Sequence, residues 1–389
     1  MTEEGQCGRQ PPLSLYVHLP WCVRKCPYCD FNSYTAGDGA PRGRYLEALL
    51  ADVEVEAGRA DGRELISIFL GGGTPSLFSP QEIGKLLDAV RHHFVMVDGI
   101  EITMEANPGT VECGDPVGYR QAGVNRLSIG AQSFSSSSLQ LLGRIHSVED
   151  IERSVTEARG AGFDNINIDL MYGLPGQTVT AAILDIEQGT RLGVNHVSWY
   201  QLTLEPNTVF HARPPAGLPD DEQSLEIQHR GQARLAELGY EQYEVSAFAQ
   251  AGRRSTHNMN YWTFGDYLAI GAGAHGKISA AGGIWRYIKS ANPKQYMENI
   301  ERREYSASLS AVSAADCLFE FMLNALRLTK GFDEDLFTAR TGLSADRLRQ
   351  RLGASIEKGL IATVDAHSWC ATPLGRRFLN DLQAEFLPD

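Results

Sequence analysis

Short apolar runs alternate with amphipathic segments from residue 13 to about residue 205. Six runs, most of them rich in Val, Ile or Leu, are typical of strands buried in a parallel sheet. These runs are LSLYVHL (13–19), LISIFL (65–70), IEITME (100–105), RLSIG (126–130), NINIDL (165–170) and HVSWYQL (196–202). The segments between them predict helices, for example over 44–57, 79–94 and 147–162, where apolar residues recur at i, i+3 and i+4 or a capping box opens the segment.

This alternation predicts an α/β fold with a parallel sheet and right-handed crossovers. Six repeats are fewer than the eight of a closed barrel, so we expect a partial (β/α)6 barrel. Sites in such sheets form at the carboxyl ends of the strands.

The remainder of the chain changes character twice. Residues 206–220 are rich in Pro and Gly and predict a loop, and residues up to 309 predict a mixed extension of the sheet. A helical pattern then runs to residue 358, followed by a hairpin candidate and a last helix, an order that resembles a winged helix. We therefore predict four parts: an N-terminal tail (1–12), a partial barrel (13–205), a barrel extension (206–309) and a C-terminal helical, winged-helix-like module (310–389).

Charge narrows the classes of partner. The 389 residues carry a formal net charge of −13, which argues against broad binding to nucleic acid or to an anionic membrane. The last part, with nine Lys or Arg against eleven Asp or Glu, gives no support for reading DNA. No apolar run approaches the roughly 18 residues of a membrane span, and the polar start MTEEGQCGRQPPLS shows no signal core. We expect a cytoplasmic protein.

Three of the seven cysteines, Cys22, Cys26 and Cys29, lie within eight residues directly after the first predicted strand. The odd total and the clustering indicate metal binding rather than a disulfide framework. A zinc site would need a fourth ligand, usually from a second C-x-x-C pair, which this sequence lacks. An iron–sulfur cluster can instead be held by three thiolates with one iron left open. The bare triplet leaves both readings open.

Three glycines follow the second predicted strand in FLGGGTPSL (69–77). Glycine at a strand end lets the backbone approach a ligand closely and exposes its N–H and C=O groups. The same residues also suit a tight βα turn, and both readings can hold together.

The pattern C-x3-C-x-aromatic-C, with Tyr28 as the aromatic residue, resembles the signature of the radical SAM superfamily. The resemblance implies a 4Fe-4S cluster held by Cys22, Cys26 and Cys29, with S-adenosylmethionine chelating the fourth iron. One electron from the cluster would cleave it to methionine and a 5'-deoxyadenosyl radical. The glycine segment would bind the methionine amine.

Four further stretches resemble the coproporphyrinogen dehydrogenase and HemW branch of that superfamily. They are EANP (105–108), LSIGAQSF (127–134), LLGRIHS (141–147) and NIDLMYGLPGQT (167–178). The resemblance implies an S-adenosylmethionine site formed by Tyr16, Tyr28, Gly72, Gly73, Thr74, Glu105, Gln132, Arg144 and Asp169. In that site Arg144 would pair with the methionine carboxylate, Glu105 would favour the cationic amine or sulfonium, and Asp169 would accept hydrogen bonds from ribose hydroxyls.

Two departures distinguish the members of this branch. The oxygen-independent coproporphyrinogen III dehydrogenase carries a fourth cysteine two residues after the third, where this chain has Phe31. It also carries an N-terminal extension, and only fifteen residues precede Tyr16 here. Both departures favour the HemW family, which implies a heme chaperone that delivers heme to acceptor proteins. The alternative is the dehydrogenase, a radical SAM oxidative decarboxylase of porphyrin biosynthesis, or another radical SAM enzyme acting on a tetrapyrrole.

The stretch HNMNYW (257–262) resembles the heme-associated segment of HemW proteins. His257 would supply an axial imidazole to heme iron, and Tyr261 and Trp262 would stack on the macrocycle. Without the resemblance, a packed histidine beside core aromatic residues is the simpler interpretation. The implied partners are heme, an unidentified acceptor protein and an electron donor, and a homodimer is a further hypothesis.

Overall fold

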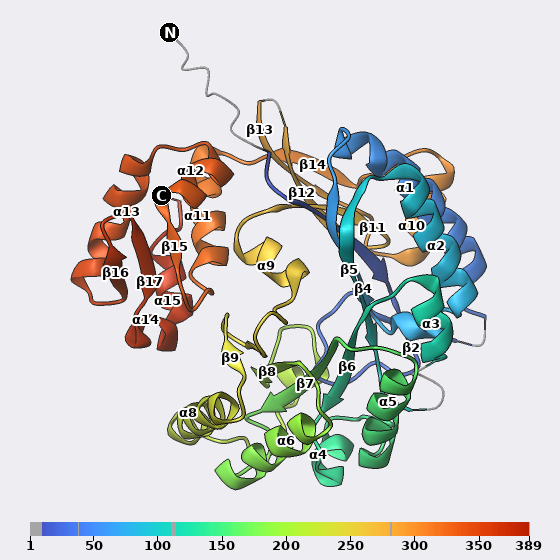
Figure 1. Cartoon of the computed structure of the whole chain (residues 1–389), viewed down its shortest axis with the longest axis horizontal. Coiled ribbons are helices and arrows are strands. Elements are labelled where there is room, and N and C mark those ends of the chain that lie inside the picture. Colours follow the sequence, from blue (N-terminus) through green and yellow to red (C-terminus); the bar gives the residue numbers. More distant parts are fainter. Residues whose placement is uncertain (1–9, 38, 110–113, 281, 389) are drawn as a thin grey trace.

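The structure is a computed structural model that describes residues 10–37, 39–109, 114–280 and 282–388. Most of the predicted N-terminal tail lies outside these residues. A twelve-stranded sheet curves through the larger lobe, in the order β14-β13-β12-β11-β1-β4-β5-β6-β7-β8-β10-β9 (Figure 1).

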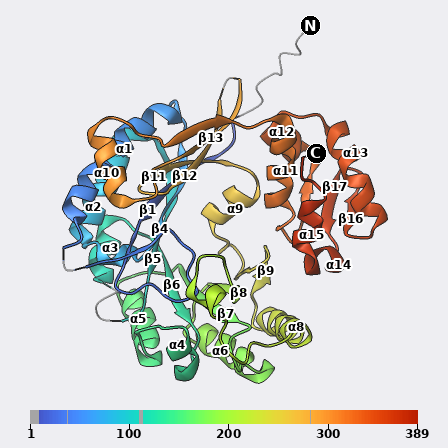
Figure 2. The ribbon, with the colours of Figure 1, turned by 180° about the vertical axis from the view of Figure 1, so that it is seen from behind.

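The six predicted strands form the parallel centre of this sheet, which confirms the partial (β/α)6 barrel. They are β1 (Leu13–Leu19), β4 (Leu65–Gly72), β5 (Met96–Ala106), β6 (Arg126–Gln132), β7 (Ile166–Tyr172) and β8 (His196–Gln201). Helices follow the strands and cover the outer face (Figures 1 and 2). These helices are α1 (Arg42–Ala60), α2 (Pro80–His93), α3 (Pro116–Ala122), α4 (Ser136–Leu141), α5 (Val148–Gly160) and α6 (Val179–Arg191).

Local signals account for several of these boundaries. Ser147 accepts a hydrogen bond from the Asp150 backbone N–H and receives the reciprocal bond, so the predicted capping box opens α5. Ser79 and Glu82 form a second capping box at the start of α2. Buried Val, Ile and Leu side chains from the strands and helices fill one large core between the sheet and its helices.

The sheet is extended on both edges by strands from the second half of the chain. β11 (Asp266–Ile270) pairs parallel with β1 and is followed by the antiparallel strands β12 (His275–Ala280), β13 (Gly283–Ile288) and β14 (Ser308–Ala311). On the far edge, β10 (Ala247–Ala249) and β9 (Glu241–Gln242) pair antiparallel. α8 (Asp221–Glu237) packs on α6, and α10 (Pro293–Glu301) packs on α1.

The predicted loop over 206–220 contains one helical turn, α7 (Val209–Ala212). The turn forms because the Thr208 hydroxyl accepts the His211 backbone N–H and so caps it. Three other short elements connect the barrel strands: β2 (Trp21–Cys22), β3 (Tyr34–Thr35) and the single turn η1 (Pro75–Leu77).

Helix α9 (Thr256–Trp262) carries the HNMNYW segment and lies between the two ends of the curved sheet (Figure 1). The Glu101 carboxylate on β5 accepts hydrogen bonds from the backbone N–H groups of Thr256 and His257. Asn260 donates from its side chain to the Ser14 hydroxyl on β1. Strands from inside the barrel therefore hold α9 in place through buried polar contacts.

The C-terminal module packs around a second apolar core, formed by Phe321, Phe337 and Leu348 and joined by Phe264 and Ile284 from the preceding part of the chain. Helices α11, α12 and α13 precede a hairpin, in the order predicted for a winged-helix-like module. Its elements are α11 (Ala314–Ala325), β15 (Phe332–Asp333), α12 (Glu334–Thr341), α13 (Ala345–Glu357), β16 (Ile361–Asp365), β17 (Ser368–Ala371), α14 (Pro373–Arg377) and α15 (Leu379–Ala384). The four predicted domain boundaries stay predictions.

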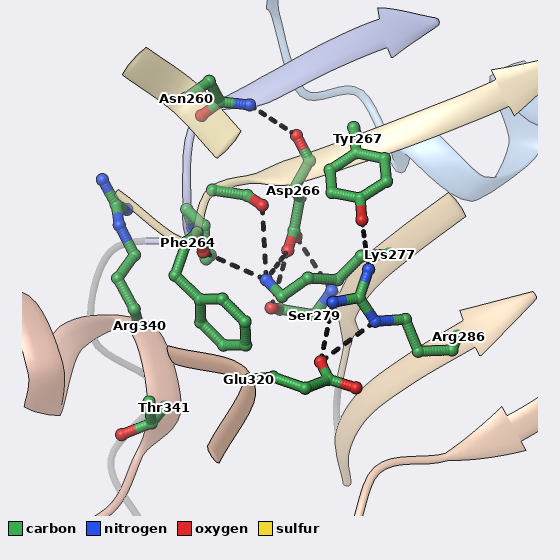
Figure 3. Close-up of polar contacts among 12 residues, drawn as sticks. Asn260, Phe264, Asp266, Tyr267, Lys277, Ser279, Arg286, Glu320, Arg340 and Thr341 are labelled. Atoms are coloured by element: carbon green, nitrogen blue, oxygen red, sulfur yellow. Dashed lines mark hydrogen bonds and ion pairs between the residues drawn. The ribbon is translucent and has the colours of Figure 1, made fainter. Parts of the chain in front are cut away.

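Polar contacts join the module to the sheet extension (Figure 3). Arg286 on β13 forms an ion pair with Glu320 on α11 at 2.7 Å. Beside them the fully buried Lys277 ammonium donates to the Asp266 carboxylate at 2.9 Å. Arg340 on α12 donates to the backbone carbonyl of Thr263, directly after α9. The module therefore contacts the segment that leaves the barrel interior. None of the helices in the described ranges combines the length and apolarity needed to cross a bilayer.

Candidate functional site

A cavity of about 490 Å³ opens at the carboxyl ends of the central strands. Its volume is that of a small-molecule site. The cysteine loop that follows β1 forms one wall, and β4 to β8 supply the others. All of the predicted cluster and cofactor residues except Tyr16 line it: Cys22, Cys26, Tyr28, Cys29, Gly72, Gly73, Thr74, Glu105, Gln132, Arg144 and Asp169.

Three free thiols lie on the loop wall. Cys22 is buried, and Cys26 and Cys29 are half-buried and joined by a tight turn in which the Cys29 N–H donates to the Cys26 carbonyl. Arg144 Nη1 donates to Cys26 Sγ at 3.4 Å, and the Ser33 hydroxyl lies 3.8 Å from Cys29 Sγ. Such donors stabilise thiolates.

The donor set fits a cluster better than one metal ion. In the described ranges no three His, Cys, Asp or Glu side chains are grouped closely enough for a single ion. A 4Fe-4S cluster needs one thiolate for each of three separate irons, and within the described part of the chain three thiols line this cavity. Burial raises the pKa of the Cys22 thiol to about 11, although hydrogen bonds with Thr74 and Ser33 oppose the shift. Iron binding would displace this proton.

The glycine segment lies directly against the cysteine loop. The Gly73 N–H donates to the Leu19 carbonyl at 2.8 Å, and the Thr74 N–H donates to the Trp21 carbonyl at 2.7 Å. A Cβ on Gly73 would lie 2.5 Å from the Trp21 carbonyl oxygen, and Gly72 has a φ of 116°. Only glycine fits both positions. The absence of side chains at Gly72 and Gly73 therefore allows the tight turn and also leaves this wall of the cavity open.

Two buried carboxyl groups face the cavity from β5 and β7. Burial and the nearby Asp169 raise the pKa of Glu105 to about 7, although its Oε2 accepts the Gly72 N–H at 3.0 Å. Burial also raises the pKa of Asp169, which accepts hydrogen bonds from Asn167 at 2.7 Å and from Ser128 at 3.3 Å. A cationic ligand would favour the charged form of both groups.

Arg144 bridges the cysteine loop and β6. Its Nη2 donates to the Gly130 carbonyl at 3.0 Å and to the Asn107 side chain at 2.6 Å, while Nη1 points to Cys26. Asn107 in turn donates to the Thr74 hydroxyl at 3.0 Å. A guanidinium held beside the cluster ligands is well placed for a carboxylate.

Sequence reasoning missed several polar residues of this wall. Asn107 lies within the EANP motif but received no role. Tyr200 donates to Gln132 Oε1 at 2.8 Å, and Gln132 has a φ of 70°, a backbone strain typical of functional sites. Arg126, Ser128 and Ser198 also line the cavity. The alternation of inward and outward side chains along β6 and β8 could have predicted these residues, because every second residue of a strand faces the barrel interior.

Tyr16 differs from the other predicted cofactor residues, because it is not among the residues that line the cavity. Its hydroxyl lies 2.9 Å from His18 Nδ1, and its ring stacks on Phe69 with centroids 6.2 Å apart. Phe69 lines the cavity in its place. Tyr16 thus lies behind the wall, and a direct contact with the cofactor stays a prediction.

The residues predicted to bind heme lie outside this cavity. His257 is buried; its Nδ1 lies 3.0 Å from the Ser67 hydroxyl and its ring stacks on Phe69. The rings of Tyr261 and Tyr267 stack at 4.2 Å. The Arg327 guanidinium lies 4.2 Å from the Trp262 ring centroid. In this conformation His257 is a packed interior residue, and α9 would have to move before its imidazole could ligate heme iron.

Replacing His257 with alanine should destabilise the protein. The change removes a buried ring and its contact with Ser67, at a cost of about 2–4 kcal/mol in the free energy of unfolding. Urea unfolding of the ligand-free protein measures the loss. His275→Ala is the matched control, because His275 is exposed. Equal stabilities of His257→Ala and the control would contradict the packed position.

Comparisons with known proteins agree with this site. Residues 16–185 match the Radical SAM superfamily model, and residues 312–378 match the HemN C-terminal domain model. The chain is 47% identical to "Heme chaperone HemW" of Escherichia coli (strain K12), over 97% of this chain and 99% of the relative. It is 35% identical to the protein of that name in Bacillus subtilis (strain 168), over 96% and 99%.

One solved structure shares nearly the whole fold. "Coproporphyrinogen III oxidase (HemN) from Escherichia coli is a Radical SAM enzyme" superposes with a TM-score of 0.82 and 26% identity, over 97% of this chain and 90% of that chain. Near full-length identity to the chaperones exceeds that to the oxidase. Together with the cysteine loop, the glycine turn and the carboxylates of one cavity, these similarities show that the chain belongs to the HemW family of radical SAM proteins.

Proposed function

We propose that this protein is a heme chaperone, which binds heme and a 4Fe-4S cluster with S-adenosylmethionine and delivers the heme to acceptor proteins. The observation that carries the proposal is near full-length similarity to proteins named "Heme chaperone HemW", at 47% and 46% identity. Phe31, where the dehydrogenase would carry a fourth cysteine, gives independent support.

The surroundings of Phe31 agree with three thiolates rather than four. Its side chain is 58% exposed and lines the cavity, and its backbone carbonyl accepts a hydrogen bond from the Lys25 ammonium at 3.0 Å. Lys25 also donates to the Ser33 carbonyl. This lysine closes the loop around the cysteines, and an aromatic ring faces solvent at the rim.

Each wall of the cavity would hold a different part of the ligands. Cys22, Cys26 and Cys29 would hold the cluster, which when bound supplies the electron for reductive cleavage of S-adenosylmethionine. Arg144 would orient the methionine carboxylate toward the cysteine loop. Glu105 would hold the cationic amine or sulfonium, and the apolar wall at Phe69 would exclude water from it.

For heme we propose the α9 segment, with His257 as ligand and Tyr261 and Trp262 as flanking rings. Burial lowers the pKa of His257 to about 3, so the imidazole is neutral at neutral pH, as iron ligation requires. Exposure of His257 would break its contact with Ser67 and release Arg327 from Trp262. The C-terminal module would therefore move with α9 when heme is taken up or delivered. An electron donor, a homodimer and a cytoplasmic location stay predictions.

One experiment separates the chaperone from the alternative enzyme. The anaerobically reconstituted protein, with S-adenosylmethionine and a reductant, should produce no protoporphyrinogen from coproporphyrinogen. The same preparation should bind heme saturably in an absorbance titration and transfer it to a heme-free acceptor. Turnover of coproporphyrinogen would contradict the chaperone-only function and favour the dehydrogenase. Absence of heme binding in the wild-type protein would remove the basis of the proposal.

A further inference from the structure

Arg126 begins β6 at the end of the strand that is farthest from the cysteine loop. Alternation places Arg126, Ser128, Gly130 and Gln132 on one face of the strand, and all four line the cavity. Gln132 lies at the carboxyl end near the cysteines, so Arg126 lies at the base of the same cavity. Arg126 is only 2% exposed to solvent.

The Arg126 guanidinium has an unsatisfied nitrogen, because its buried Nε has no hydrogen-bond partner among the described residues. Across residues 10–37, 39–109, 114–280 and 282–388, it forms no ion pair within 4 Å and no hydrogen bond, and its Nε is buried without a partner. A buried guanidinium normally pairs with a carboxylate, because desolvating an unpaired charge is costly. Arg126 is therefore an unbalanced cation in the wall of a cavity.

A second unpartnered group lies next to it. Thr103 on β5 is the register partner of Arg126. Its Oγ1 is buried without a hydrogen-bond partner. Glu101 and Glu105, two residues on either side, face the barrel interior, so Thr103 shares that face. Thr103 is fully buried and does not itself line the cavity, so Arg126 is the member of this pair that faces the cavity.

The nearby carboxylates make other contacts. Asp169 accepts from Ser128 and Asn167, and its pKa is affected by the charge of Arg126 without an ion pair between them. Glu101 accepts the N–H groups that begin α9, and Glu105 accepts the Gly72 N–H. Among the described residues, none of these three carboxylates forms an ion pair with Arg126.

We propose that Arg126 binds a carboxylate of the molecule that occupies the base of the cavity. The planar guanidinium matches a carboxylate in bidentate fashion. A phosphate dianion fits less well, because Glu105 and Asp169 line the same cavity and repel a doubly charged anion more strongly than a singly charged carboxylate. The methionine carboxylate is assigned to Arg144 at the opposite end. Resting on the proposed function, the carboxylate at Arg126 is that of an alkyl acid such as a heme propionate.

The first test needs no heme. Thermal unfolding of the full chain is measured in sodium propionate and in sodium chloride at equal ionic strength. Propionate at about ten times its Kd should raise the Tm of the wild-type protein by about 2 °C and leave that of Arg126→Gln unchanged. The control is Arg24→Gln, which removes an exposed arginine at the rim and should respond as the wild type does. Sodium phosphate should have no specific effect.

The same measurement excludes a purely structural role. In chloride, Arg126→Gln should unfold at the wild-type temperature or above it, because the change removes a buried unpaired charge. A Tm several degrees lower in chloride would show that Arg126 supports the fold through a partner and would overturn the proposal. An equal rise with propionate in wild type and Arg126→Gln would overturn it as well.

A second arm identifies the source of the carboxylate. Wild type and Arg24→Gln should bind hemin about tenfold more tightly than hemin dimethyl ester, and Arg126→Gln should lose this preference while still binding S-adenosylmethionine. Equal affinities for hemin and its ester in the wild type would overturn heme as the source. If no variant binds heme, the proposed chaperone function fails, and the propionate shift still decides whether Arg126 binds a carboxylate.

Discussion

Replacing Cys22, Cys26 or Cys29 with alanine is expected to abolish the iron–sulfur absorbance of the reconstituted protein. Each thiol would hold a different iron, and among the residues that the structure describes no other cysteine lines the cavity to replace a lost ligand. Iron and sulfide content should fall with the brown colour. These changes are expected to be all-or-none for each single variant.

Cys317 and Cys370 provide the matched controls. Both are free thiols of the C-terminal module, the first in α11 and the second in β17, and neither lines the cavity. Alanine at either position should leave cluster content unchanged. Full cluster content in any of the three loop variants would show that the ligands are assigned incorrectly.

The affinity for S-adenosylmethionine should fall steeply as pH drops below about 7. Burial and Asp169 raise the pKa of Glu105 to about 7, so below that pH the group is neutral in the ligand-free protein. Binding of a cationic ligand then requires loss of a proton, which weakens binding about tenfold for each pH unit. Asp169, whose pKa burial also raises, titrates in the same direction. Above pH 7 the affinity should level off.

The raised pKa of Glu105 has the opposite effect on the stability of the ligand-free protein, which should fall as pH rises. The folded pKa of Glu105 lies above the ordinary value of 4.5, so its contribution to stability is complete below that pH and is lost as pH rises to about 7. Binding and stability should therefore respond to pH in opposite directions. This opposition distinguishes a functional carboxyl from a structural one.

Glu105→Gln tests the assignment. The variant should bind S-adenosylmethionine more weakly at pH 8, by about one to two orders of magnitude, with the Glu105-dependent part of the pH response removed. Glu47→Gln on the exposed face of α1 should keep the wild-type profile. Binding isotherms between pH 5 and 8 on cluster-loaded protein measure both. A flat profile in the wild type would contradict the role of Glu105.

Helix α9 connects the two lobes physically. Inside the barrel, Asn260 and His257 contact Ser14 and Ser67. On the other side, Arg327 and Arg340 of the C-terminal part contact Trp262 and Thr263. A change at the barrel interior can therefore reach the module through one helix of seven residues.

The chain's local patterns were enough to predict the parallel core, and the resemblance of its cysteine motif to the radical SAM signature predicted the cluster ligands. Apolar β-branched runs separated by amphipathic segments have few ways to bury their surface other than a β/α sheet, and the cysteine loop has to follow the carboxyl end of its strand. The capping box at Ser147 and the hairpin of the last module are also local signals, and the structure contains both. Such features depend on residues close together in sequence.

Long-range packing decided the rest. The sequence of the HNMNYW segment is compatible both with exposure to a ligand and with packing in the interior. Only contacts with residues about 190 and 246 positions away in the sequence place His257 and Asn260 inside the barrel. Tyr16 lies behind Phe69 for the same reason. Arg126 is unremarkable in sequence, because an arginine becomes an unpaired buried cation only when strands from distant segments leave it without an anion. The resemblance carried by the cysteine motif was enough to predict the cofactor chemistry, whereas the position of the internal helix and the charge at the base of the cavity depend on which distant side chains meet.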